Sequence, residues 1–322
     1  MRAMFVTSRI VLACLGLAAC SGSDDGSGSA GSESTTTVES TGTSAPTTGT
    51  GTAEPTTGTS TTETGGAPAT MGLPEGVSKW TGQGEIDSLT FGFEVTITNS
   101  GGDLTATAKL KDDPGVGIGN PEFALSGTHE PSAGRVALAP NDWIVLPDLD
   151  IELIGLEGVY DPEAKALTGM LVDFAKGSEN YLLGGPVTLT LVDGPGEATI
   201  RGDESRSLVV GSQKFSGQFQ CTGPVRETAG ELVYDGAGGL TGTLAVGDPG
   251  LDTPIGTFTI TGVHNPSTGG ITLVPGLWID DQGTLLAFYI DGTFDPMTGS
   301  FTGDQWTNTA VCPKGLWKTT IE

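Results

Sequence analysis

The sequence predicts an all-β protein with two tandem antiparallel meander domains, and two observations support this fold class. The first is an alternation of period two. Phe91, Phe93, Val95 and Ile97 are separated by small or polar residues, as expected of a strand that buries one face and exposes the other. The second is the return of turn sequences such as NSGG, DGAGG and NPSTGG, at roughly ten-residue spacing. No segment after the first twenty residues has the apolar periodicity of an amphipathic helix.

The two domains are copies of one another. KWTGQ at residues 79–83 matches KFSGQ at residues 214–218, an offset of 214 − 79 = 135 residues. FALSGTHEPSAGRVALAPNDWI, from residue 123, matches FTITGVHNPSTGGITLVPGLWI, from residue 258, with the same offset. GVYDP then matches GTFDP at an offset of 292 − 158 = 134. Order and spacing hold throughout, so a domain of about 110 residues has been duplicated in tandem.

These matches set the domain boundaries. The first β-domain is expected at residues 79–192 and the second at residues 214–322, with a linker at residues 193–213. Each copy has room for roughly seven to nine strands, arranged as a closed β-barrel or as a two-sheet β-sandwich.

The first nineteen residues have the composition of a secretory signal peptide. Arg2 and Arg9 are basic, and the apolar run at residues 10–19 is too short to span a bilayer. The run leads into Leu-Ala-Ala-Cys, which resembles the lipobox of bacterial lipoproteins. The resemblance implies that Cys20 becomes the mature N-terminus and carries acyl chains, which would anchor the protein in a lipid bilayer. Ser21, in place of Asp, implies the outer membrane of the cell envelope, facing the periplasm or the surface.

A stalk is expected between this anchor and the first domain. Residues 21–78 contain no Lys, Arg or aromatic residue and consist mainly of Ser, Thr, Gly, Pro and Ala. Such a composition cannot bury enough apolar surface to fold. Residues 20–78 are therefore expected to be the lipidated cysteine followed by a disordered segment.

The four cysteines of the chain agree with export. Cys14 leaves with the signal peptide and Cys20 is lipidated by the resemblance, so Cys221 and Cys312 remain and are expected to form a disulfide. Cys221 follows the first strand of the second copy and Cys312 precedes its last strand. A disulfide needs Cα atoms within about 7 Å, so first and last strands should be neighbours. This favours the barrel over the sandwich.

Three features recur in the domains, W/F-[TS]-G, G-x-H-x-P-S-x-G and P-x-x-W-I, and the second copy adds a late cysteine. Together they resemble a β-module of exported bacterial proteins that has no assigned activity. The resemblance covers nearly all of residues 214–322 and, less completely, residues 79–192. In architecture the domains are also similar to avidin-like and lipocalin-like barrels, a likeness that implies no site.

The only two histidines, His129 and His264, stand at equivalent positions before a turn. Tyr160 and Phe294 stand in the same place in GVYDP and GTFDP. Because Tyr and Phe cannot perform imidazole chemistry, we interpret the shared requirement as a ring at the end of a strand, before a turn. The histidines are then scaffold, and phenylalanine should replace His264 without loss of the fold.

Trp143 and Trp278 are also equivalent, and each is followed by Ile. They are candidate ligand-stacking residues, because a tryptophan ring can pack on a sugar. The alternative is that both fill the core. An exposed pair would favour the first interpretation, and a buried pair the second.

The remaining polar features argue against other classes of site. The formal net charge of −25 disfavours nucleic acid and anionic lipid as partners. The carboxylate pairs Asp112-Asp113, Asp148-Asp150 and Asp280-Asp281 lie in apparent turns and are not repeated by the duplication, so turn formation explains them better than glycoside hydrolysis. We expect no catalytic residue, no metal site and no cofactor.

The sequence therefore predicts a surface-displayed, membrane-anchored lipoprotein with non-catalytic binding or structural β-domains. Its expected partners are the lipid bilayer, through acylated Cys20, and a glycan or an envelope or protein ligand. The alternative is a carbohydrate-acting hydrolase that uses paired carboxylates.

Overall fold

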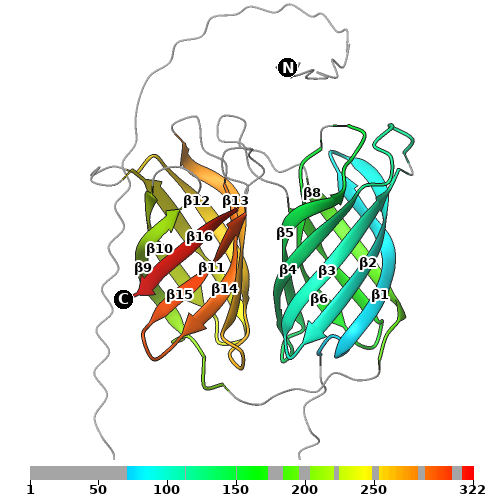
Figure 1. Cartoon of the computed structure of the whole chain (residues 1–322). Helices are drawn as coiled ribbons and strands as arrows, with labels where there is room; N and C mark the ends of the chain where they lie inside the picture. The colour runs from blue at the N-terminus through cyan, green and yellow to red at the C-terminus, as the bar shows by residue number, and fades with distance from the viewer. Residues whose placement is uncertain are drawn as a thin grey trace, which may run out of the picture. The chain divides into compact units, whose positions relative to one another are not determined.

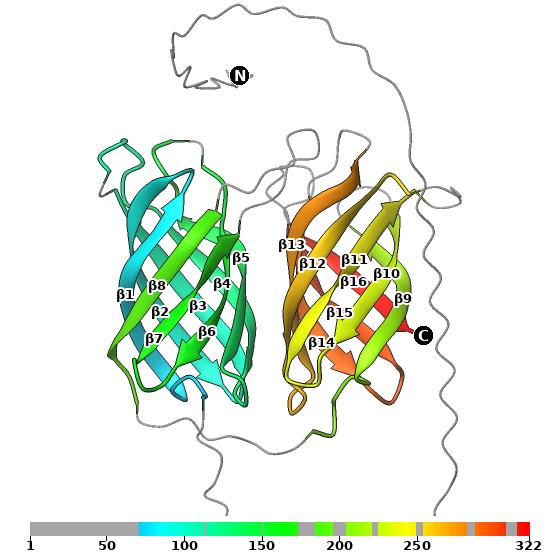
Figure 2. The same cartoon turned by 180° about the vertical axis from the view of Figure 1, so that it is seen from behind.

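The computed structural model describes residues 71–112, 114–149, 151–172, 184–195, 204–220, 225–248, 254–281, 287–306 and 314–322. These residues form sixteen strands in two closed antiparallel barrels of eight strands each (Figure 1 and Figure 2). The all-β class and the tandem arrangement are confirmed, and the barrel is the correct choice over the sandwich. No helix in the described part of the chain is long and apolar enough to cross a bilayer.

The first barrel contains β1 to β8 and the second β9 to β16, with the following bounds. The first comprises β1 (Gly76–Ile86), β2 (Leu89–Ser100), β3 (Asp103–Lys111), β4 (Glu122–Glu130), β5 (Arg135–Val145), β6 (Gly155–Asp161), β7 (Ala166–Val172) and β8 (Gly184–Asp193). The second comprises β9 (Gly211–Gln220), β10 (Val225–Tyr234), β11 (Gly239–Gly247), β12 (Gly256–His264), β13 (Gly270–Asp281), β14 (Tyr289–Asp295), β15 (Ser300–Trp306) and β16 (Lys314–Ile321).

Each sheet closes because its first and last strands pair. In the first barrel Gly82 of β1 lies opposite Leu189 of β8, and in the second Gly217 of β9 lies opposite Thr319 of β16. The expectation that the first and last strands are neighbours is confirmed. Cys221 and Cys312, from which it was drawn, lie outside the described residues.

The repeated W/F-[TS]-G sequence lies at this closing seam. A Cβ atom on Gly82 would stand 1.9 Å from the carbonyl oxygen of Thr188, and one on Gly217 would stand 2.2 Å from that of Lys318. Only glycine allows the two backbones to approach so closely. The duplicated glycine is therefore explained by barrel closure.

Alternate residues of the strands fill the barrel interiors. On β2 the side chains of Phe91, Phe93, Val95 and Ile97 are buried, as the period-two pattern predicts. The interiors hold two clusters of buried hydrophobic residues. The described interiors are thus packed cores rather than open channels.

Ordered structure begins earlier in each copy than the repeat indicated. Leu73 is buried in the core of the first barrel and Leu208 in that of the second. The stalk predicted to reach residue 78 gives way to β1 at Gly76, and the linker predicted to reach residue 213 gives way to β9 at Gly211. The part of residues 20–78 that precedes residue 71, including Cys20, lies outside the described residues.

Candidate functional site

His129 joins three segments of the first barrel through two backbone hydrogen bonds. Its Nε2 atom accepts the N–H of Leu73 at 2.8 Å, and its Nδ1 atom lies 2.8 Å from the carbonyl oxygen of Arg135. Because a carbonyl oxygen can only accept, the ring carries its proton on Nδ1 and is neutral. His129 thereby ties the segment before β1 to the β4–β5 hairpin.

His264 makes the same contacts in the second barrel. Its Nε2 atom accepts the N–H of Leu208 at 3.2 Å, and its Nδ1 atom lies 3.1 Å from the carbonyl oxygen of Gly270. Burial lowers the pKa of both His129 and His264 to about 4, because the charged ring would lose its hydration. Both nitrogens of each ring are therefore used by the fold, as the scaffold interpretation requires.

The four rings at strand ends do not share a single requirement, however. Tyr160 packs its ring edge-on against Trp80, with the centroids 5.6 Å apart, and Phe294 packs at 83° to the ring of His264. A phenyl ring has neither the donor nor the acceptor that His264 uses. The structure therefore argues against replacement of His264 by phenylalanine, because the buried N–H of Leu208 would lose its acceptor, whereas the C=O of Gly270 would keep the N–H of Asn265.

A sequence signal for this histidine contact did exist. Leu73 precedes His129 by the same distance as Leu208 precedes His264, since 129 − 73 = 264 − 208 = 56. The short match L-x-x-G therefore extends the repeat upstream of the KWTGQ segment. It was too short to be noticed without the structure.

The two equivalent tryptophans have different environments. Trp278 is 5% exposed and lies edge-on to Phe258, with the centroids 5.1 Å apart. Trp143 lies edge-on to Phe123 at 5.5 Å but is only half-buried. Trp278 is thus part of the core and cannot offer its face to a sugar, whereas Trp143 retains an exposed portion.

Of the carboxylates singled out in the sequence, Asp112 and Asp148 lie in loops as expected, whereas Asp280 lies on β13 and its expected place in a turn is wrong. Asp112 accepts the N–H groups of Val116 at 2.9 Å and Gly117 at 2.7 Å, an arrangement that stabilises the loop after β3. Asp280 is exposed on β13. Asp113, Asp150 and the side chain of Asp281 lie outside the described residues.

Two half-buried carboxylates that were not among the predicted sites connect the barrels. Asp291 on β14 accepts hydrogen bonds from Ser126 Oγ on β4 at 2.6 Å and from Thr272 Oγ1 on β13 at 2.7 Å. Glu157 on β6 accepts one from Thr261 Oγ1 on β12 at 2.6 Å. The sequence did contain an indication of these two carboxylates, because the repeat places an acidic residue directly before the glycine of GVYDP and of GTFDP.

Burial raises the pKa of Asp291 and Glu157, and the hydroxyl donors lower it in part. A carboxyl group with a raised pKa can act as a general acid if a substrate reaches it. Here each carboxylate accepts a hydroxyl hydrogen bond from the other barrel. The arrangement therefore joins the barrels rather than placing two carboxylates across an open cleft.

The comparisons with known proteins add no family to this description. No protein-family model matches the chain, and no curated protein matches it. Within the described ranges, no group of three or more His, Cys, Asp or Glu side chains is placed to hold a metal ion. The function must therefore be inferred from the residues.

Proposed function

We propose that the protein is a lipid-anchored lipoprotein of the cell envelope that displays two non-catalytic β-barrels as a binding or structural module. The observation that carries the proposal is the Leu-Ala-Ala-Cys sequence at the end of a short apolar run, which makes Cys20 the acylation site. The acyl chains of Cys20 would place the barrels at a bilayer, and the Ser/Thr-rich segment would separate them from it.

The non-catalytic role is supported by how the reactive side chains are used. His129 and His264 bind backbone groups, and Asp291 and Glu157 bind hydroxyls. A nucleophile or general base needs a free lone pair that a substrate can approach. Both ring nitrogens of each histidine are already used within the fold, and each carboxylate is engaged by a hydroxyl of the other barrel.

A surface suited to ligand binding lies where β5 and β13 end. Ile144 is 53% exposed beside half-buried Trp143, and Leu146 is 73% exposed. The duplication repeats only the exposed isoleucine, since Ile279 is 61% exposed while Trp278 beside it is buried. Exposed apolar side chains beside an aromatic ring are typical of surfaces that bind the apolar face of a sugar or a protein partner.

The anchor is tested by replacing Cys20 in the full-length chain. Cys20→Ser should move the protein from the membrane fraction to the soluble fraction and abolish the acylated N-terminal peptide in mass spectrometry, because the thiol that carries the lipid is absent. Cys14→Ser, inside the same apolar run, is the matched control and should remain anchored. Equal membrane retention of both variants would refute the proposed acylation site.

The binding role is tested by screening the full-length chain against glycans and envelope polymers, with Trp143→Ala and Trp278→Ala in parallel. Trp143→Ala should stay folded and lose binding. Trp278→Ala should lower stability by about 3 to 5 kcal/mol, because it empties part of the core. Unchanged binding by folded Trp143→Ala would exclude this surface, and release of reducing sugars would favour the hydrolase instead.

A further inference from the structure

The contact between the barrels uses the same positions twice. Ser126 Oγ donates to Asp291, and Thr261 Oγ1 donates to Glu157. Ser126 and Thr261 are equivalent in the repeat (261 − 126 = 135), and so are Glu157 and Asp291 (291 − 157 = 134). Each barrel therefore supplies a hydroxyl and a carboxylate, and each hydroxyl binds the carboxylate of the other barrel. Such reciprocity defines an isologous, two-fold contact.

The hairpins that follow β4 and β12 repeat this reciprocity. Asn265, after β12, donates from Nδ2 to the carbonyl oxygens of His129 at 2.8 Å and Gly101 at 3.3 Å in the first barrel. Glu130 is its equivalent, and it packs on the β10–β11 turn of the second barrel. There, a Cβ atom on Gly238 would stand 2.3 Å from Glu130 Cγ. Both residues are almost fully buried.

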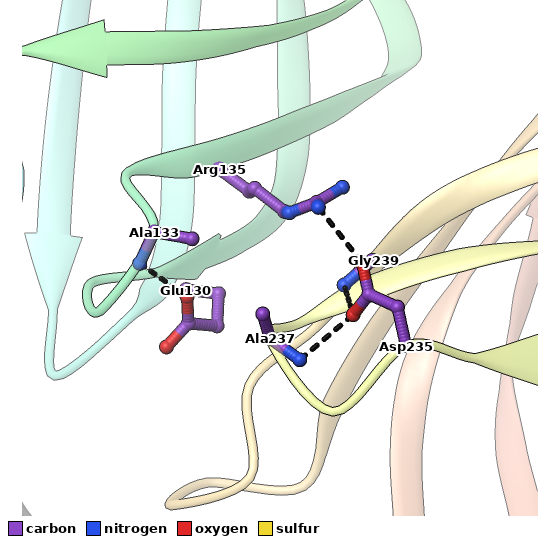
Figure 3. Close-up of polar contacts among 6 residues, drawn as sticks. All are labelled: Glu130, Ala133, Arg135, Asp235, Ala237 and Gly239. Carbon is purple, nitrogen blue, oxygen red and sulfur yellow. Dashed lines mark hydrogen bonds and ion pairs between the residues drawn. The ribbon is translucent and has the colours of Figure 1, made fainter. Parts of the chain in front are cut away.

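Figure 3 shows the Glu130 side of this contact, where the symmetry is imperfect. Arg135 reaches across to Asp235 with an N···O distance of 2.7 Å, and Asp235 also accepts the N–H groups of Ala237 and Gly239. The equivalent of Arg135 is Gly270, so the ion pair occurs on one side only. The two barrels have therefore diverged at this contact.

A larger difference lies on the pseudo-two-fold axis, where equivalent positions must meet. Tyr289 and Gly155 are equivalent (289 − 155 = 134) and they touch each other. The hydroxyl of Tyr289 accepts the N–H of Gly155 at 3.1 Å and donates to the carbonyl oxygen of Val172. The tyrosine is fully buried in the core cluster of the first barrel, and a Cβ atom on Gly155 would stand 2.5 Å from its ring.

The residues paired with Tyr289 and Gly155 on the neighbouring strands also differ in size, and again the larger one belongs to the second barrel. Tyr289 pairs with Trp306 across β14 and β15, and Gly155 pairs with Val172 across β6 and β7. Trp306 also packs against the core cluster of the first barrel. Both large aromatic residues thus belong to the second barrel, and the first barrel has small residues at both places.

We infer that Tyr289 and Trp306 form a selective docking surface on the second barrel, and that the first barrel is the partner that binds there. The two barrels should bind each other even when the chain between them is cut. Each barrel should also bind the other in preference to a second copy of its own kind. Two second barrels would place two tyrosine rings in one space, and two first barrels would leave glycine facing glycine over a void. Overpacking and cavities both weaken an association. This inference is independent of the proposed function.

The test uses the full-length chain with a protease site inserted between residues 196 and 203 and an affinity tag at the C-terminus. After cleavage in detergent, the second half is captured through the tag and the retained first half is quantified. Cys221 and Cys312 both belong to the second half, so a disulfide between them cannot join the halves. The readout does not depend on Cys20, so failure of the anchor would not affect it.

The halves should remain together at about 1 μM, as expected of a specific protein interface. Tyr289→Phe removes only the hydroxyl and should weaken retention roughly tenfold. Gly155→Tyr adds a ring where Tyr289 already lies, and should weaken it more than about 100-fold. Thr302→Val changes an exposed residue of β15 and serves as the control. Circular dichroism of the uncleaved variants checks that each is folded.

Self-association is tested by mixing two cleaved chains with different tags. A tagged second half should not capture a second half that carries the other tag. Separation of the unmodified halves at this concentration would overturn the inference. So would capture of one second half by another, or an equal loss of retention in Tyr289→Phe and Thr302→Val.

Discussion

The two barrels share one strand topology but fill their interiors from different strands. Phe219 on β9 is equivalent to Gly84 on β1 (219 − 84 = 135). A Cβ atom on Gly84 would stand 3.0 Å from the ring of Phe93 on β2, whereas the residue equivalent to Phe93 is Thr228. At this place the interior of the first barrel is filled by Phe93 of β2, whereas the interior of the second barrel is filled by Phe219 of β9.

The second barrel continues this aromatic filling around its interior. Phe219 stacks on Trp317 with an interplanar angle of 12° and lies 5.1 Å from Phe288, which in turn lies 5.3 Å from Phe258. The difference teaches that closure of an eight-stranded barrel requires a filled volume but does not require a particular strand to fill it. Cores tolerate such exchange when the total volume is kept.

The largest expected difference between the barrels comes from the predicted disulfide. A bridge between Cys221 and Cys312 closes 312 − 221 = 91 residues, worth about 4 to 5 kcal/mol in the chain-entropy model. Reductant should therefore destabilise the second barrel and spare the first. Amide hydrogen exchange measured for each barrel, with and without reductant, separates the two, and equal changes in both would refute the pairing.

The aromatic filling is tested by Phe219→Ala, with Phe93→Ala as the counterpart in the first barrel. Each substitution should lower the free energy of unfolding of its own barrel by about 3 to 4 kcal/mol, because it leaves a cavity in the core. Urea unfolding followed by hydrogen exchange assigns the loss to one barrel. If Phe219→Ala destabilised both barrels equally, the two cores would not be independent.

Acidification should destabilise both barrels through the histidines. The pKa of His129 and His264 is lowered from 6.5 to about 4, so the unfolded chain binds more protons between these values. Stability is then complete above pH 6.5 and falls as the pH falls toward 4, by roughly 3 kcal/mol for each histidine.

Asp291 and Glu157 act in the opposite sense, because their pKa values are raised. Protonation of these carboxyls favours the folded state as the pH falls. Urea unfolding at pH 7 and pH 4.5 should therefore show a loss in the unmodified chain that His129→Gln with His264→Gln reduces. The same pH dependence in both proteins would contradict the histidine assignment.

The histidine contact itself should matter equally in the two barrels. His264→Phe should cost about 1 to 3 kcal/mol, because the buried N–H of Leu208 loses its acceptor, although the C=O of Gly270 still accepts the N–H of Asn265. His129→Phe should cost a similar amount through Leu73 and Arg135. Thermal unfolding checks both, and an unchanged melting temperature for either would restore the view that only a ring is needed.

The smallest expected effect is that of the one-sided ion pair. Arg135→Ala removes the contact with Asp235, and both side chains are more than a third exposed. A pair screened by solvent contributes about 0.5 kcal/mol or less, and the effect should disappear at high salt. Thermal unfolding at low and high salt tests this, with Thr302→Val as the control that should show no salt dependence.

Much of the fold could be predicted because it depends on local patterns. The alternation of Phe91, Phe93, Val95 and Ile97 indicates which face of a strand is buried, and the repeat locates the equivalent strands of the second copy. The pairing of first and last strands was expected from a disulfide between Cys221 and Cys312 that itself stays a prediction. The first two of these inferences use residues close in sequence or a fixed offset.

The partners of the functional side chains could not be predicted in the same way. The sequence determined that His264 stands at a strand end before a turn, but only the tertiary structure decided that its ring binds Leu208. It likewise decided that Asp291 binds Ser126 and that Tyr289 binds Gly155 and Val172 of the first barrel. Such contacts depend on how closed sheets bring distant backbones together and on which side chains fill the space between them, and no local period encodes that.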